Sequence, residues 1–332
     1  MNEMSLALPG LSPPCLREGV PAISVVLPSL DEGDNLRELL PDLARVLATL
    51  SPRWEIIVVD DGSRDGTAAL CARWAQEPYF RALLLSRNFG KEAALSAGLD
   101  AALGDVVLLM DADGQHEPAL IPVLLQRWRE GADMVCTVRT DRSDESLSKR
   151  WSTRLFYRLL RTGPAFRVLA DAGDFRLLDR RVVTALRALP ERTRFMKGLY
   201  AWVGFATQTV AYTPAPRRHG RSRFPWRRLA ALSVIGITAF STWPLRTVSV
   251  LGIGMAMLAF LFGGALAVGH LLGGEPVSGV TTVLIGMALL SGVQLIALGV
   301  LGEYLGRVFD EVKGRPLYLV RRELGRGLQS PP

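Results

Sequence analysis

The segment VVLLMDADGQHEP, residues 106–118, combines an apolar run with two closely spaced aspartates and a proline. Its apolar first half predicts a buried strand over Val106–Met110, and a helix that starts with a proline is predicted near 117–130. Between them lie Asp111 and Asp113, two carboxylates one residue apart. Both can reach one divalent cation if the strand ends in a turn, and hard oxygen ligands select Mg²⁺ or Mn²⁺. The alternative is that the two aspartates cap the following helix.

The same order of a short apolar strand followed by a helix extends in both directions along residues 21–213. Such alternation predicts βαβ units and therefore an α/β fold with a mostly parallel sheet, which binds ligands at the carboxyl ends of its strands. The predicted strands are Ile23–Leu27, Glu55–Val59, Ala82–Leu85, Val106–Met110 and Met134–Val138, and the predicted helices lie near 34–49, 66–76, 91–102 and 117–130.

Charged residues follow two more of the predicted strands. Glu55–Val59 runs into Asp60 and Asp61, whose carboxylates are able to accept hydrogen bonds from a base or a ribose. The third predicted strand runs into a segment with Arg87 and Lys91, and cations beside a carboxylate-bound metal are what a diphosphate requires. The chain has neither GxGxxG nor a Walker A sequence, which disfavours a dinucleotide dehydrogenase and a P-loop ATPase.

The composition excludes several classes of protein. Apolar residues make up 49% of the 332 residues and charged residues 21%, so the chain is not disordered as a whole. Its three cysteines, Cys15, Cys71 and Cys136, lie far apart, which excludes a disulfide framework and a CxxC metal cluster and fits a reducing compartment. Because the chain has only three histidines, a zinc site built mainly from histidine is unfavourable.

The charge and hydropathy of the C-terminal third indicate a membrane protein. Seven arginines in 217–246 account for the net charge of +7, because that stretch contains no acid and the rest of the chain sums to zero. Thr247–Gly269 and Val277–Gly302 carry no charge, and each exceeds the roughly 20 apolar residues that span a bilayer. Arginine and lysine flank both outer ends and avoid the loop between them, which predicts cytoplasmic termini. A pair of buried core helices is the alternative.

Two further segments are predicted to lie on the membrane surface. Residues 146–162 place apolar side chains on one stripe of a helix and basic ones elsewhere, and 226–243 directly precedes the first uncharged stretch. For 146–162 the alternative is a helix packed on its own domain. The predicted organisation is a disordered leader without a signal-peptide run at 1–20, a catalytic domain at 21–215, a basic juxtamembrane segment with interfacial helices at 216–245, two transmembrane helices with a short non-cytoplasmic loop at 246–303, and a cytoplasmic tail at 304–332.

Eight motifs in a fixed order carry a family resemblance: VVLPSLDEGDNL, VVDDGSRDGT, SRNFGKEAALSAGLD, DADGQHEP, GDFRLLDRR, ERTRFMKGLYAWVG, RSRF and GEYLGRVFDEVKGRPLY. Over roughly residues 22–320 the chain resembles inverting family 2 glycosyltransferases. More narrowly, it is similar to the members that act on polyisoprenyl phosphate, namely bactoprenol glucosyltransferases, dolichol-phosphate mannose synthases and undecaprenyl-phosphate aminoarabinose transferases.

The resemblance implies a GT-A fold, a nucleotide-sugar donor, a lipid-phosphate acceptor and Mg²⁺ or Mn²⁺ as the cofactor. It assigns Asp111, Asp113 and Gln115 to the metal, with Asp113 as the most direct ligand. The residues expected around the donor are Pro28, Asp31, Glu32, Asp60, Asp61, Arg87, Lys91 and Asp111.

The expected acceptor site follows from charge. A phosphate monoester is already an anion at neutral pH, so it needs basic residues that bring it close to an anionic donor more than it needs a general base. Attack from the face opposite the nucleotide inverts an α-linked donor into a β-linked product, while metal and cations stabilise the departing diphosphate. The candidates for holding the acceptor phosphate are Arg139, Arg142, Lys197, Arg217, Ser222 and Arg223.

Asp174 lies where sugar-processing members of this family place an acid. Asp174, Asp113 and Lys197 are therefore the predicted catalytic residues. Asp174 is able to steer the acceptor, bind a sugar hydroxyl or stabilise oxocarbenium-like charge. The alternative is a structural pair with Arg176 or a neighbouring arginine.

These observations predict an inverting glycosyltransferase of the inner membrane that moves glucose from UDP-glucose onto undecaprenyl phosphate at the cytoplasmic face. GDP-mannose, UDP-N-acetylglucosamine and UDP-4-amino-4-deoxy-L-arabinose or its formyl derivative are the alternative donors. A non-catalytic membrane tether is the alternative from another class, and a processive synthase is disfavoured because no QxxRW motif is present. No nucleic-acid partner is expected, and a homo-oligomer is compatible with the small residues Gly252, Gly254, Gly263 and Gly264.

Overall fold

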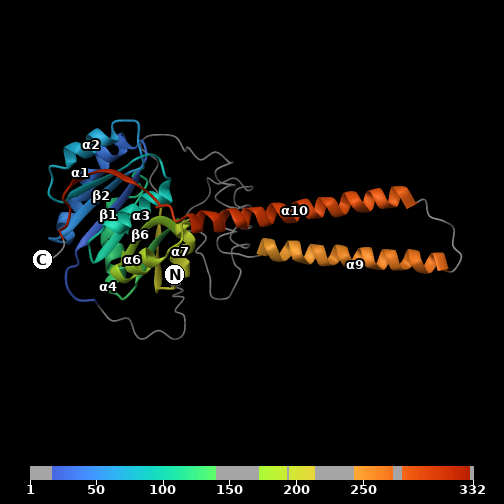
Figure 1. Ribbon diagram of the computed structural model, residues 1–332. Helices are drawn as coiled ribbons and strands as arrows, with labels where there is room; N and C mark the ends of the chain where they lie inside the picture. Colours follow the sequence, from blue (N-terminus) through green and yellow to red (C-terminus); the bar gives the residue numbers. More distant parts are fainter. Residues whose placement is uncertain (1–16, 140–171, 193, 214–242, 272–278, 330–332) are drawn as a thin grey trace.

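The computed structural model describes residues 17–139, 172–192, 194–213, 243–271 and 279–329. In these residues a sheet is covered by helices on both faces, and two long helices lie side by side and project away from it (Figure 1). The sheet has eight strands in the order β7-β5-β6-β4-β1-β2-β3-β8. They are β1 Ile23–Ser29, β2 Trp54–Asp60, β3 Phe80–Leu85, β4 Val106–Leu109, β5 Met134–Arg139, β6 Ala172–Asp179, β7 Thr207–Tyr212 and β8 Val320–Gly325.

The α/β fold expected from the sequence is confirmed. β1 pairs in parallel with both β2 and β4, β2 pairs in parallel with β3, and β5 pairs in parallel with β7. All five predicted strands are present, with bounds that differ from the predictions by at most two residues at either end. The helices are α1 Gly33–Leu50, α2 Thr67–Trp74, α3 Lys91–Ala101, the 3₁₀ helix η1 Pro118–Leu120, α4 Ile121–Arg129, α6 Arg180–Ala188, α7 Met196–Trp202, α9 Trp243–Leu271 and α10 Gly279–Lys313.

Each face of the sheet has its own set of helices, because successive side chains of a strand point to opposite faces. In β1, Val25 and Leu27 pack with apolar residues of α1, α2 and α4, whereas Val26 packs with those of α3, α6 and α7. All three are fully buried, which is typical of strands that are covered on both sides. The faces of the sheet are therefore filled by core, and polar chemistry is confined to the ends of the strands.

β6 is an antiparallel strand that the sequence analysis did not predict, and it lies between β4 and β5. Its register with β4 pairs Leu109 with Arg176. Two further steps along the same register place Asp174 opposite Asp111. β6 therefore carries Asp174 to the edge where the parallel strands end, and it carries Asp179 to the opposite edge of the sheet.

β8 shows that the cytoplasmic tail predicted at 304–332 is in part a strand of the catalytic sheet. It pairs antiparallel with β3, and Arg81 of β3 forms an ion pair with Glu323 of β8. Just before it, the backbone N–H of Ser86 donates to the carbonyl of Leu319 at 2.9 Å. The strand has the sequence VRRELG, and most of its side chains are exposed. It therefore lacks the apolar pattern by which a strand is recognised, and its pairing is decided by the free edge of β3.

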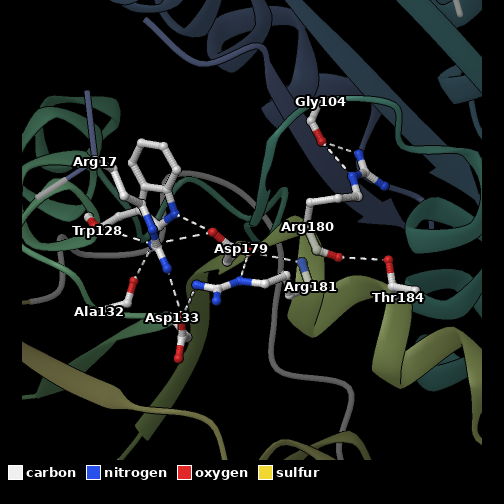
Figure 2. Close-up of polar contacts among 9 residues, drawn as sticks. All are labelled: Arg17, Gly104, Trp128, Ala132, Asp133, Asp179, Arg180, Arg181 and Thr184. Carbon is white, nitrogen blue, oxygen red and sulfur yellow. Dashed lines mark hydrogen bonds and ion pairs between the residues drawn. The ribbon is translucent and has the colours of Figure 1, made fainter. Parts of the chain in front are cut away.

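The N-terminal leader predicted at 1–20 does not extend to Arg17, whose guanidinium is fixed to the domain (Figure 2). The guanidinium donates to the carbonyl of Ala132 at 2.7 Å and to the carboxylate of Asp133 at 2.7 Å, and it lies 3.2 Å from Asp179. It also stacks 4.9 Å from the ring centre of Trp128. Nothing in the local sequence indicates this attachment, because its partners come from residues more than 100 positions away.

The long helices α9 and α10 carry many exposed apolar side chains, among them Phe260 with 81% of its surface accessible. Within the described residues, one segment, Leu290–Lys313, is long and apolar enough to cross a membrane, and Thr247–Phe262 is a shorter apolar helix. The prediction of two membrane-spanning helices is therefore supported for one helix, and the second stays a proposal. The helix α10 also passes the predicted boundary at 303 and ends at Lys313. The interfacial helices predicted at 146–162 and 226–243 fall outside the described residues, apart from the last residue of the second.

Candidate active site

The carboxyl ends of β2, β3 and β4 meet the beginning of β6 at one edge of the sheet, and many of the predicted site residues lie there. Asp111 follows β4, Lys91 follows the loop after β3, and Asp174 lies near the start of β6. These residues are 83 positions apart at the extremes, yet their side chains are in contact. The topology of the sheet is what brings them together.

Lys91, the first residue of α3, links two carboxylates. Its Nζ lies 2.6 Å from Asp111 and 2.5 Å from Asp174. The preceding Gly90 has a φ of +98°, a conformation that glycine adopts readily, and this turn starts the helix at the edge of the sheet. Burial alone would lower the pKa of Lys91, but Asp111 and then Asp174 raise it above its usual value. The ammonium therefore stays charged and neutralises part of the acidic cluster.

Asp174 is held by two lysines and not by the neighbouring arginine. Besides the contact with Lys91, its carboxylate lies 3.9 Å from the Nζ of Lys197 on α7. Burial raises the pKa of Asp174, but Lys91 and then Lys197 outweigh it and hold the pKa well below its usual range. The guanidinium of Arg176 instead donates to the carbonyl of Gly173 and stacks 4.3 Å from the ring of Tyr200. The structural pair with Arg176 is thus not what the structure contains.

The residues expected to hold a metal lie in a turn, as the sequence analysis required. Gly114 has a φ of +73°, and the backbone N–H of Gln115 donates to a carboxylate oxygen of Asp113 at 3.1 Å. In the part of the chain that the structure describes, no three His, Cys, Asp or Glu side chains form a cluster that could hold an ion by themselves. Two carboxylates and an amide suit a metal whose remaining ligands come from water and a diphosphate, which is how Mg²⁺ is usually bound. The donor set therefore fits Mg²⁺ or Mn²⁺.

Asp60 is the last residue of β2 and Asp61 follows it, and both are buried. The carboxylate of Asp60 accepts a hydrogen bond from the N–H of Ser63 at 2.9 Å. The two oxygens of Asp61 accept from the N–H groups of Phe89 at 2.7 Å and Gly90 at 2.8 Å, and burial nevertheless raises the pKa of this acid. Both aspartates thus shape the loops next to Lys91. Their predicted contacts with a base and a ribose stay predictions.

A close approach of two loops fixes the position of Arg87. Gly62 has a φ of +76°, and a Cβ added there would lie 2.7 Å from the carbonyl carbon of Arg87 and 2.8 Å from the nitrogen of Asn88. Any side chain at position 62 would therefore push the two loops apart. Arg87 itself is exposed, and its guanidinium stacks 4.1 Å from the ring centre of Phe89. It is available at the edge for an anionic ligand.

The end of β1 brings Pro28, Asp31 and Glu32 to the same side of the sheet. Pro28 is buried within the strand. Asp31 has a φ of +55°, and its carboxylate accepts a hydrogen bond from the N–H of Arg64 at 2.8 Å, which ties the loop after β1 to the loop after β2. Glu32 accepts from the side-chain amide of Asn35 in the first turn of α1. These contacts organise the loops, and the predicted donor contacts stay predictions.

Few of the residues predicted to bind the acceptor phosphate can be placed. Arg139 is the last residue of β5 and pairs with Tyr212 of β7 in the sheet, but its side chain lies outside the described part of the chain. Arg142, Arg217, Ser222 and Arg223 also lie outside the described residues. Of this group, Lys197 is the one side chain that the structure describes, and it lies beside Asp174.

Sequence reasoning missed two residues next to this cluster. Glu92 follows Lys91, its carboxylate accepts a hydrogen bond from the N–H of Met196 at 3.2 Å, and burial and then the charge of Asp174 raise its pKa to about 7. His116 is buried against Phe175 and Tyr212, and within the described residues its Nδ1 has no hydrogen-bond partner. Burial lowers the pKa of His116, so it is neutral at physiological pH. The position of Glu92 directly after Lys91 was the available signal, but its contact with α7 is a tertiary feature.

Several known proteins have sequences similar to this chain. Residues 24–187 match the glycosyl transferase family 2 model. An uncharacterized glycosyltransferase of Synechocystis sp. is 42% identical over 299 residues, which are 90% of this chain and 94% of the relative. A prophage-derived bactoprenol glucosyl transferase of Shigella flexneri is 41% identical over 302 residues, which are 90% of this chain and 97% of the relative.

A more distant likeness is found among solved structures. Glucosyl-3-phosphoglycerate synthase from Mycobacterium tuberculosis, in complex with Mn²⁺, UDP and phosphoglyceric acid, is 22% identical with a TM-score of 0.48, over 66% of this chain and 76% of that one. This likeness is too distant to carry an inference about the site. The two sequence relatives are 42% and 41% identical to this chain over almost their whole length. Together with the match to the family model, this identity shows that the chain belongs to glycosyltransferase family 2.

Proposed function

We propose that this chain is a metal-dependent inverting glycosyltransferase that moves a sugar from a nucleotide donor onto polyisoprenyl phosphate, with UDP-glucose as the donor and undecaprenyl phosphate as the acceptor. The observation that carries the proposal is the chain of contacts Asp111–Lys91–Asp174 at the edge of the sheet. Relatives of nearly full length that are named bactoprenol glucosyl transferase support the choice of sugar and lipid.

The arrangement of charge suits a diphosphate leaving group. Lys91 is paired with Asp111 and Asp174, and Arg87 is exposed at the same end of the sheet. A divalent ion held by Asp111, Asp113 and Gln115 would supply positive charge where the bond to the sugar breaks. Lys91 and Arg87 then add hydrogen bonds and charge to the same diphosphate, which is where the transition state becomes more negative.

Asp174 acts as an anion in this proposal and not as a proton carrier. Lys91 and Lys197 hold its pKa well below its usual range, so it is ionised at any physiological pH and is a weak base. A phosphate monoester has a second pKa of about 6, so the acceptor needs no proton removed. Asp174 instead orients Lys197 toward the acceptor phosphate and stabilises the positive charge that develops at the anomeric carbon.

The membrane part places the site at the water–lipid boundary. We propose that α9 and α10 both span the inner membrane, with the catalytic domain and both termini in the cytoplasm. The arginines at 217–228 then lie at the cytoplasmic surface, where anionic lipid and the acceptor phosphate both attract them. The small residues Gly252 and Gly254 have no atom within 4 Å of an added Cβ, which leaves space for a second copy of the chain against α9.

The decisive experiment uses the full chain in membranes with undecaprenyl phosphate. UDP-glucose, GDP-mannose, UDP-N-acetylglucosamine and UDP-4-amino-4-deoxy-L-arabinose are supplied one at a time, and the lipid product is identified by mass. A hexosyl-phosphoryl-undecaprenol that requires UDP-glucose and a divalent ion is the expected result. A product that carries another sugar would identify the corresponding nucleotide sugar as the donor in place of UDP-glucose. The complete absence of lipid product with every donor would overturn the proposed transferase activity and favour a non-catalytic membrane tether.

A further inference from the structure

The loop between α6 and α7 is held by the end of the long helix α10. The backbone N–H of Arg192 donates to both carboxylate oxygens of Glu311, at 2.8 Å and 3.0 Å. The guanidinium of the same arginine donates to the carbonyl of Arg315 at 2.9 Å. Glu311 lies in the last turn of α10, in the segment that is apolar and long enough to cross a membrane. A membrane-side helix is thus attached directly to a loop of the catalytic domain.

The other end of the same loop leads into the active site. Arg194 contacts Ser96 of α3 at 3.4 Å, and the N–H of Met196 donates to Glu92 of α3 at 3.2 Å. The next residue, Lys197, is the one that lies 3.9 Å from the carboxylate of Asp174. Four residues lie between Arg192 and Lys197, so the attachment of Arg192 to α10 and of Met196 to α3 restrains the position of Lys197.

We propose that Glu311 is a positioning residue, which acts through Arg192 and the described residues of the loop before α7 to hold Lys197 against Asp174. The inference rests on the proposed role of Asp174 in the transferase reaction. One continuous set of contacts then fixes both the depth of α10 in the membrane and the position of Lys197 relative to Asp174. The contact between Lys197 and Asp174 is long for an ion pair, so a small displacement of the loop is enough to break it.

The contact is solvent-exposed, so its loss has a moderate effect and leaves the fold intact. In Glu311→Ala we expect kcat to fall about fivefold, which corresponds to about 1 kcal/mol in the barrier. The KM for the nucleotide sugar stays within about twofold, because Lys91 and Asp111 do not contact the loop. In Glu311→Gln the amide oxygen still accepts from the N–H of Arg192, so part of the loss is recovered.

Two matched variants separate positioning from general damage. Asp310→Asn removes a negative charge from the same turn of α10 and leaves Glu311 in place. Tyr318→Phe removes the hydrogen bond from its hydroxyl to Asp100 at 2.8 Å, which attaches the segment after α10 to α3 and not to Arg192. Both are expected to keep the kcat of the wild type.

The measurements are steady-state kinetics and amide hydrogen exchange of the full chain in detergent or nanodiscs. Faster exchange in peptides covering 189–203 of Glu311→Ala, together with the selective fall in kcat, supports the proposal. Wild-type exchange in those peptides, or an equal fall in the two control variants, overturns it. If the wild type itself transfers no sugar, the proposed function fails, and the exchange comparison still decides whether Glu311 fixes the loop.

Discussion

An aspartate lies near each end of β6, the half-buried Asp174 and the buried Asp179, and the partners of the two acids differ in kind. Asp179 accepts from the backbone N–H of Arg181 at 2.9 Å and from the indole of Trp128 at 2.8 Å, with the guanidinium of Arg17 beside it (Figure 2). Asp174, at the other end, is held by the ammonium groups of two lysines.

The difference separates an ion cluster that stabilises the fold from one that is able to work on a ligand. The donors to Asp179 are a backbone N–H, a rigid indole and planar guanidinium groups, so its hydrogen bonds are geometrically fixed. The donors to Asp174 sit on flexible four-carbon stems, and one of them, Lys91, is shared with Asp111. A lysine in that position can transfer its hydrogen bonds to a diphosphate without any rearrangement of the backbone.

The largest expected effect is at the proposed metal site. In Asp111→Asn combined with Asp113→Asn we expect transfer activity to fall by a factor of about 1,000 or more, because the charge that neutralises the departing diphosphate is lost. Removal of divalent ions with EDTA from the wild type should have a similar effect, and Mg²⁺ or Mn²⁺ should restore it. Binding of Mn²⁺, followed by electron paramagnetic resonance in the presence of UDP, should weaken in the variant. Unchanged Mn²⁺ binding would contradict the ligand assignment.

The comparison itself is tested by one substitution at each end of β6. In Asp174→Asn we expect kcat to fall by a factor of about 100, because the anion that holds Lys91 and Lys197 is lost, while the KM for the donor changes little. The measurement is the rate of lipid-linked product formation. Full turnover in Asp174→Asn with intact donor binding would refute its place in the site.

At the opposite end, Asp179→Ala should lower the free energy of unfolding by about 2 kcal/mol, since the helix α6 loses its N-terminal cap and Trp128 its acceptor. The kcat of the folded fraction should be that of the wild type. Thermal unfolding in detergent and the specific activity of the soluble, folded protein measure the two quantities. A loss of kcat as large as in Asp174→Asn would show that the cluster around Asp179 also serves the reaction and does not only stabilise the fold.

An effect of about the same size is expected from the titration of Glu92. Its pKa is raised from 4.5 to about 7 by burial and by Asp174, so the folded state binds a proton more tightly than the unfolded chain does. The stability that this provides is complete below about pH 4.5 and is lost as the pH rises through 7. Glu92→Gln removes this dependence on pH. Between pH 5 and pH 8 the free energy of unfolding of the variant should therefore rise by on the order of 2 kcal/mol relative to that of the wild type. Parallel pH profiles of thermal stability would contradict this assignment.

The smallest effect is expected for Arg17→Ala. Arg181 still contacts both Asp133 and Asp179, so the two acids keep a cation and the loss of stability should be about 1 kcal/mol. Activity should not change, because the residue lies at the edge of the sheet opposite the lysines. Thermal unfolding gives the first quantity and product formation the second, with Arg37→Ala, an exposed i,i+3 pair on α1, as the neutral control.

Much of the candidate site was predictable from the sequence, because its residues lie in the segments that follow apolar strands. The motif DADGQHEP places Asp111 and Asp113 after β4, and NFGKE places Lys91 after β3. Neither motif indicates that β6 runs antiparallel beside β4, which is what makes Lys91 the link between Asp111 and Asp174. The position of a strand that is inserted between two others is known only from its pairing with them.

The sequence by itself determined the alternation of strands and helices, the family and the identity of the charged residues, because these depend on local apolar periodicity and on short motifs. The tertiary structure decided which charges are partners: Asp174 with Lys197 and not with Arg176, Glu92 with the N–H of Met196, and Glu311 with the loop before α7. It also decided that a polar stretch after α10 completes the sheet as β8. The reason is physical, since an ion pair or an edge strand gains its stability from groups far away in the chain and leaves no periodic trace in the local sequence.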